Sequence, residues 1–233
     1  MIANLPNNGF IMAVDGPSGA GKSTACRAVA KQLAAKYLDT GAMYRVATLH
    51  VLNLGIDPSD ETRVVAATAA LPMAVNDDPT STKVMLDGSD VSREIRGAEV
   101  TAAVSEVSAY PAVRENLVAL QRELATQAHR CIVDGRDIGT TVLVDAPLKI
   151  FLTASPEVRA KRRFDQDVAA GRNVDFDAVL ADVIRRDTLD STRAVSPLRP
   201  AEDATIIDTS ELTFDQVVTC LMELALKSQE GAQ

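Results

Sequence analysis

The sequence is 233 residues long, with 24 basic and 32 acidic residues and a formal net charge of −8. This length suits a single domain with a sizeable core, and the acidic balance excludes sequence-independent nucleic-acid binding, which requires a basic surface. Cys26, Cys131 and Cys220 lack CxxC spacing and a neighbouring His cluster, so neither a disulfide framework nor a zinc site is expected.

The amino-terminal segment shows no basic region followed by a long apolar run, and no apolar stretch approaches the length of a membrane span. We therefore expect a cytoplasmic protein that binds neither membranes nor nucleic acid. We also expect it to be a monomer.

The first motif along the chain is GPSGAGKS at residues 16–23, which matches the phosphate-loop pattern GxxxxGK[ST]. Before it, residues 10–14 form an apolar run typical of a buried parallel strand. After it, Ala25, Val29 and Leu33 recur on one helical face. In such a loop the backbone N–H groups surround a polyphosphate, Lys22 reaches the outer phosphates and Ser23 ligates Mg²⁺. The sequence thus predicts a site for a nucleoside triphosphate.

Strand and helix patterns then alternate. Residues 37–41 predict a short strand that ends in turn residues, and residues 43–54 predict a helix. Residues 61–96 change character, because short strand-like runs at 72–75 and 83–86 are separated by turn signals, the last being Asp87-Gly88. We expect a small antiparallel insert in one domain whose core is formed by about residues 10–60 and 97–227.

The second half of the chain predicts a helix around residues 113–124 and three apolar, β-branched strands at 131–134, 149–152 and 204–208. Helices are expected at 156–170 and 176–189 and at the carboxyl end of the chain. The fold class is therefore α/β, a doubly wound parallel sheet. Ligands of such sheets bind beyond the carboxyl ends of the strands. The polar residues expected there are Asp15, Asp39, Asp134 and Thr153.

Nine basic residues, eight of them arginine, lie between Arg159 and Arg199. Solvated helix faces with intrahelical ion pairs account for some of them. The excess of arginine over lysine favours a phosphate site, because the planar guanidinium group binds phosphate in a bidentate manner and lysine does not.

Further motifs follow in order: DTGAMYR at residues 39–45, VSEVSAYPAVRENLVALQR at 104–122, DGRDIGT at 134–140 and RRDTLDSTRAVSPL at 185–198. With these motifs and the phosphate loop, the chain resembles the bacterial cytidylate kinases from about residue 11 to the final helix. The resemblance implies a nucleoside-monophosphate-kinase fold that transfers the γ-phosphoryl group of ATP, with Mg²⁺, to CMP or dCMP in pyrimidine metabolism. It also implies that residues 61–96 form a nucleotide-binding lobe and that residues 156–175 form a helical lid over ATP.

The resemblance also assigns roles to single residues. The CMP phosphate is expected between Arg45, Arg136 and Arg193, the ribose near Arg186 and Asp190, and the cytosine against Ser105, Arg114 and Asp137, with Thr40 and Tyr44 completing the CMP site. The residues expected to bind ATP are Gly16, Pro17, Ser18, Gly19, Ala20, Gly21, Lys22, Ser23, Thr24, Arg159 and Arg163. Lys22, Arg136 and Arg193 are the expected catalytic residues, and Ser23 the expected metal ligand.

Some alternatives stay open at this stage. Asp15 and Asp134 are candidates for holding Mg²⁺-bound waters, with structural hydrogen bonding as the other possibility for each. The phosphoryl acceptor is alternatively UMP or a non-nucleotide molecule. The set Ser105, Arg114 and Asp137 disfavours the non-nucleotide acceptor. A slowly hydrolysing nucleotide switch is a third possibility, although the chain has no guanine-reading NKxD motif.

Overall fold

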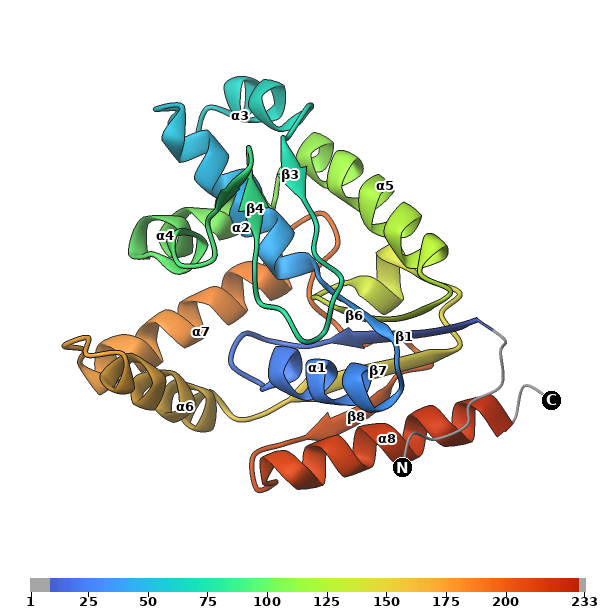
Figure 1. Ribbon diagram of the computed structural model, residues 1–233. Coiled ribbons are helices and arrows are strands. Elements are labelled where there is room, and N and C mark those ends of the chain that lie inside the picture. The colour runs from blue at the N-terminus through green and yellow to red at the C-terminus, as the bar shows by residue number, and fades with distance from the viewer. Residues whose placement is uncertain (1–8, 231–233) are drawn as a thin grey trace.

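The computed structural model describes residues 9–230. Its main sheet has five parallel strands. Their order across the sheet is β2 (Lys36–Asp39), β6 (Arg130–Asp134), β1 (Phe10–Asp15), β7 (Leu148–Thr153) and β8 (Thr205–Asp208) (Figure 1). The chain leaves β1 toward one edge of the sheet and later returns to fill the other, so the predicted doubly wound sheet is confirmed.

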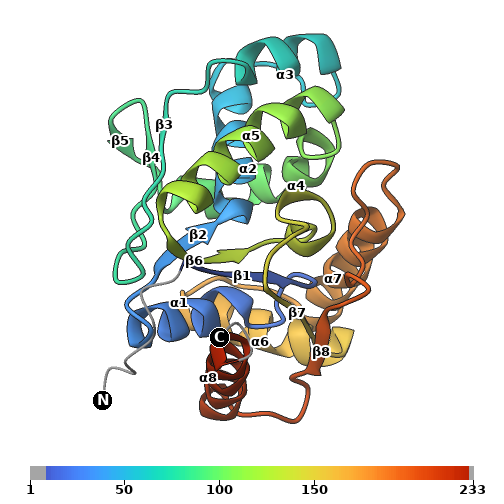
Figure 2. The ribbon, with the colours of Figure 1, turned by 90° about the vertical axis from the view of Figure 1, so that its right-hand side faces the viewer.

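Helices cover both faces of the sheet, as Figure 2 shows. One face carries α1 (Lys22–Gln32) and α8 (Phe214–Glu230), and the other carries α2 (Thr40–Asn53) and α5 (Pro111–Gln127). Beyond the carboxyl ends of the strands lies a hairpin of two helices, α6 (Pro156–Ala169) and α7 (Phe176–Thr192) (Figure 1). No helix among the described residues is long and apolar enough to cross a membrane.

Strand alternation divides the core into two layers. Met12 and Val14 of β1 pack with α1 and with Leu221 of α8, whereas Ala13 between them packs with α2 and α5. Successive side chains of a strand point to opposite faces, so a strand covered on both faces is apolar throughout. Leu221 is fully buried, and truncating it to alanine would cost about 2–5 kcal/mol of folding free energy.

The predicted small antiparallel sheet is also present, with β4 (Met85–Leu86) between β3 (Met73–Ala74) and β5 (Ser89–Asp90). Asp87 and Gly88 join β4 to β5, and both have positive φ angles, of 48° and 74°. This two-residue turn is of the kind that an Asp-Gly pair favours. The helix α3 (Glu61–Thr68) precedes this sheet and the 3₁₀ turn η1 (Glu94–Arg96) follows it.

Four local features differ from the sequence-based expectation, the first being helix α3, which was not predicted within residues 61–96. The helix α2 begins at Thr40 rather than at residue 43, because the Asp39 carboxylate accepts a hydrogen bond from the Ala42 N–H (2.9 Å) and caps the helix. The helix α4 (Ala98–Val107) was not predicted. Nor was the π-helical turn η2 (Ile138–Val142), which follows β6 and borders the site described next.

Candidate active site

The phosphate loop lies against β7 and opens directly into α1. At Gly16, whose φ is 147°, an added Cβ would lie 1.9 Å from the Leu152 carbonyl oxygen, so only glycine fits there. Gly21, also with positive φ, is the N-cap of α1, and no side chain caps the helix. The first N–H groups of α1 are therefore left for a ligand, and their partial positive charge favours an anion.

Lys22 is buried at the centre of this loop. Its Nζ donates to the carbonyl oxygens of Gly16 (2.8 Å) and Pro17 (2.9 Å) and lies 4.0 Å from Asp134 Oδ1. Burial, and then the neighbouring Arg136, lower the pKa of Lys22 to about 8. The ammonium group is thus held in place, and a bound phosphate would offset the burial and the like charge that lower its pKa.

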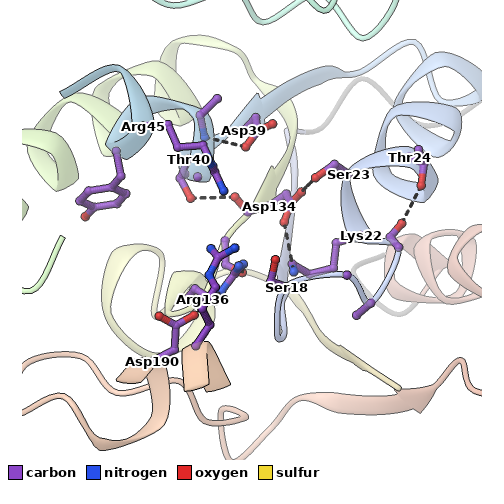
Figure 3. Close-up of a pocket in the computed structure, with 18 of the residues that line it drawn as sticks. Ser18, Lys22, Ser23, Thr24, Asp39, Thr40, Arg45, Asp134, Arg136 and Asp190 are labelled. Atoms are coloured by element: carbon purple, nitrogen blue, oxygen red, sulfur yellow. Dashed lines mark hydrogen bonds and ion pairs between the residues drawn. The ribbon is translucent and has the colours of Figure 1, made fainter. Parts of the chain in front are cut away.

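Asp134, at the carboxyl end of β6, contacts two residues of the phosphate-loop motif, Lys22 and Ser23. Its Oδ2 accepts hydrogen bonds from the Ser23 hydroxyl (2.6 Å) and the Tyr37 hydroxyl (3.1 Å), and Figure 3 shows Ser23 and Lys22 both directed at it. The described residues contain no cluster of three His, Cys, Asp or Glu that could form a metal cage by itself. A hydroxyl next to a carboxylate nevertheless fits Mg²⁺, which is bound through one or two protein oxygens together with substrate phosphates.

Asp15, at the end of β1, has a different role. Its two carboxylate oxygens accept hydrogen bonds from the backbone N–H groups of Ile138 (2.7 Å) and Gly139 (2.8 Å). Burial raises the pKa of Asp15 to about 6. Asp15 therefore anchors η2, which begins directly after Arg136 and Asp137, and of the two acids considered for Mg²⁺ only Asp134 faces Ser23.

A cleft of about 540 Å³ extends from the phosphate loop between α2, α4, α5 and α7. All ten residues that the sequence predicted to bind CMP line it: Thr40, Tyr44, Arg45, Ser105, Arg114, Arg136, Asp137, Arg186, Asp190 and Arg193. Of the predicted ATP-binding residues, Arg163 and residues 18–24 line it as well. The other three, Gly16, Pro17 and Arg159, are not part of the lining.

Arginine side chains dominate the middle of the cleft. Arg136 Nε donates to Asp190 (3.0 Å), and Arg45 Nη1 donates to the Ile95 carbonyl (2.9 Å) and to Thr101 (3.0 Å). Burial, and then the like charges of neighbouring arginines, lower the pKa of Arg45 to about 9 and also lower the pKa of Arg186. Such mutual repulsion makes this part of the cleft a strong site for an anion.

The far end of the cleft is organised around Asp137. This buried carboxylate forms an ion pair with Arg114, and its other oxygen lies 3.7 Å from Arg193 Nη2. The Arg114 guanidinium also lies over the Tyr44 ring, 5.4 Å from its centroid. Donors and an acceptor thus meet beside an aromatic face, an arrangement suited to the polar edge of a planar base.

The profile of the cytidylate kinase family matches residues 12–227. The chain belongs to the cytidylate kinase family. It is similar to the cytidylate kinase of Corynebacterium glutamicum, with 70% identity over 97% of this chain and 98% of the relative, and to that of Corynebacterium diphtheriae, with 71% identity over the same shares. The cytidylate kinase of Rhodococcus opacus is 59% identical over 97% of this chain and 99% of its own. The predicted family and phosphotransferase class are confirmed.

The cleft is also lined by residues that the sequence did not predict. Arg162 donates to the Thr209 carbonyl (2.7 Å) and hydroxyl (3.1 Å), and Leu212 and Phe214 continue this wall close to the phosphate loop. Phe214 is 53% exposed despite its size. Leu212 and Phe214 follow β8, and Arg162 lies on α6, which follows β7. The rule that ligands bind beyond the carboxyl ends of strands could therefore have pointed to them.

Proposed function

We propose that this cleft transfers the γ-phosphoryl group of ATP to CMP or dCMP, giving ADP and CDP or dCDP. The observation that carries the proposal is the continuity of a single cavity. A phosphate loop forms one end of it, an Asp–Arg pair suited to a base forms the other, and buried or half-buried arginines lie between. This order matches a donor triphosphate facing a nucleoside monophosphate.

On the donor side, ATP phosphates would lie against residues 18–24, where the loop N–H groups and Lys22 carry positive charge. Ser23 and Asp134 would hold Mg²⁺, since their oxygens are adjacent (2.6 Å). When bound, Mg²⁺ neutralises charge on the β- and γ-phosphates. Arg163 lies on α6 and would contact ATP from there. This helix belongs to the proposed lid, residues 156–175.

On the acceptor side, Arg45, Arg136 and Arg193 would hold the CMP phosphate, a dianion that calls for several guanidinium groups. Asp190 would accept a hydrogen bond from a ribose hydroxyl, with Arg186 beside it. Ser105, Arg114 and Asp137 would read the base, because cytosine presents an amino donor next to two acceptors. Thr40 and Tyr44 would complete the wall.

The transfer itself needs no general base, because the attacking phosphate oxygen of CMP is already anionic at neutral pH. One P–O bond forms to this oxygen as the bond between the β,γ-bridging oxygen and the γ-phosphorus breaks, and ADP leaves with the electron pair. The residues contribute position and charge neutralisation through Lys22, Arg136 and Arg193. Closure of the lid and of the insert, residues 61–96, would exclude water from the γ-phosphoryl group.

An acceptor screen tests the proposal. ADP release would be followed with Mg·ATP and, in turn, CMP, dCMP, UMP, a hydroxyl-bearing sugar acid or no acceptor. We expect fast release with CMP or dCMP, weak release with UMP and almost none with the other two. Equal release without an acceptor would indicate a hydrolase instead, and preference for UMP or the sugar acid would reassign the acceptor. The monomeric state and cytoplasmic location stay predictions.

A further inference from the structure

Arg159, in the first turn of α6, is buried, and its guanidinium group is bonded to protein acceptors rather than free to bind a ligand. Its side chain is 3% exposed. The guanidinium group forms a bidentate ion pair with Asp187 of α7, with Nη1–Oδ1 and Nη2–Oδ2 distances of 2.9 and 2.5 Å. It also donates through Nε to the Ala154 carbonyl (2.8 Å) and through Nη1 to the Ser18 carbonyl (3.2 Å).

These contacts join three separate pieces of the chain. Ala154 follows β7, Ser18 lies in the phosphate loop, and Asp187 lies on α7. The loop also rests on the base of the same side chain, because a Cβ added to Gly19 would lie 3.1 Å from Arg159 Cβ. A planar group with fixed donors holds such a set of acceptors more rigidly than a lysine could.

Asp187 connects this junction to the acceptor end of the cleft. Its neighbours on α7, Arg186 and Asp190, both line the cleft, whereas Asp187 and Arg159 do not. The ion pair therefore fixes the helix that carries groups for the acceptor relative to the loop that carries groups for the donor. A misplacement of about 1 Å between reacting groups can cost on the order of 10²-fold in rate.

We infer that Arg159 and Asp187 are positioning residues that couple the ATP and CMP sites by tying the phosphate loop to α7. The inference rests on the proposed function. It gives Arg159 a role different from the direct ATP contact that the sequence predicted. It also keeps the first turn of α6 attached to the loop, so that any lid movement is confined to residues beyond it.

The alternative is an ion pair that stabilises the fold and nothing else. A matched control is available on the same helix, where Arg185 Nη2 pairs with Asp182 Oδ1 at 2.6 Å and both side chains are substantially exposed. Asp182→Asn removes a carboxylate from an arginine without touching the loop. Surface pairs of this type contribute little, so this variant should retain parental stability and kinetics.

The test compares Asp187→Asn with Asp182→Asn. Calorimetry would give the Kd of CMP with and without a non-hydrolysable ATP analogue and Mg²⁺, and steady-state rates would give kcat and KM. In the parent we expect the analogue to tighten CMP binding about tenfold, within the usual range of coupling between two sites. In Asp187→Asn that ratio should fall close to one, and kcat should drop on the order of 10²-fold, while the Kd of CMP alone changes little.

Arg159→Lys keeps the charge but loses the bidentate pair, so it should show an intermediate loss of coupling and of kcat. It replaces Asp187→Asn in the test if that variant fails to fold. The inference is overturned if the parent shows no coupling, or if Asp187→Asn or Arg159→Lys retains parental coupling and kcat. It is also overturned if both Asp variants lose kcat equally. A parent that makes no CDP would instead overturn the proposed function.

Discussion

Replacing Arg186 should change folding stability and catalytic activity in opposite directions. Its Nε and Nη1 are buried and have no hydrogen-bond partner within the described part of the chain, and burial followed by the charge of Arg136 lowers its pKa. A buried donor without a partner costs about 1–3 kcal/mol. In Arg186→Met the aliphatic stem is retained and the guanidinium is removed, so the free energy of unfolding should rise by about 1–3 kcal/mol.

The same substitution should impair the reaction. If both nitrogens bind the acceptor nucleotide, two charged hydrogen bonds at about 1.5–3 kcal/mol each are lost. The transition state for CMP should then lose about 3–6 kcal/mol of stabilisation. This corresponds to a fall in kcat/KM for CMP on the order of 10²–10⁴-fold.

Thermal unfolding and initial rates measure the two effects on one preparation. For a chain of this size the expected stabilisation raises Tm by about 2–4 °C per kcal/mol. Arg185→Met, next in sequence but exposed and paired with Asp182, is the control and should change stability by no more than about 0.5 kcal/mol. A lower Tm together with unchanged kcat/KM in Arg186→Met would refute the reasoning, since it would mean that these nitrogens serve the fold and not an anion.

Three further predictions concern other cleft residues. Because the pKa of Lys22 is lowered to about 8, its ammonium group loses its proton above that pH, and kcat/KM for ATP should decline from about pH 8 upward; a profile level to pH 10 would contradict this. Arg193→Lys should cost about 2–3 kcal/mol of transition-state stabilisation and lower kcat/KM for CMP accordingly. Near-parental rates would remove Arg193 from the proposed CMP site. Asp137→Asn should reduce the ratio of kcat/KM for CMP to that for UMP by about tenfold or more, because an amide can face either base; an unchanged ratio would transfer base recognition to Ser105 and Arg114.

The central strands β6, β1 and β7 were predictable because burial on both faces leaves short apolar runs in the sequence. The edge strands β2 and β8 carry exposed residues, and the signals for them were the turn residues that follow β2 and the β-branched residues of β8. The start of α2 was not predictable to the residue. Gly41 is typical of a turn in sequence. Gly41 lies in the first helical turn because the Asp39 carboxylate accepts a capping hydrogen bond from the Ala42 N–H.

The gathering in one cleft of the ten residues proposed for CMP was predictable, because these residues fall within short motifs of the family. The fate of Arg159 was not, because a sequence does not distinguish an arginine that faces a ligand from one buried against Asp187. The wall formed by Arg162, Leu212 and Phe214 was missed for a related reason. It combines one residue from α6 with two that follow β8, and only the folded chain brings them together.

The most direct measurement of the central claim follows the transferred group itself. The protein would be incubated with CMP, Mg²⁺ and ATP labelled in the γ-phosphoryl group, and the products separated. The account predicts that the label appears on the β-phosphate of CDP, in an amount equal to the ADP formed, and that Lys22→Ala forms very little of it. Label recovered as inorganic phosphate, or on a protein side chain, would contradict direct transfer between two nucleotides in this cleft.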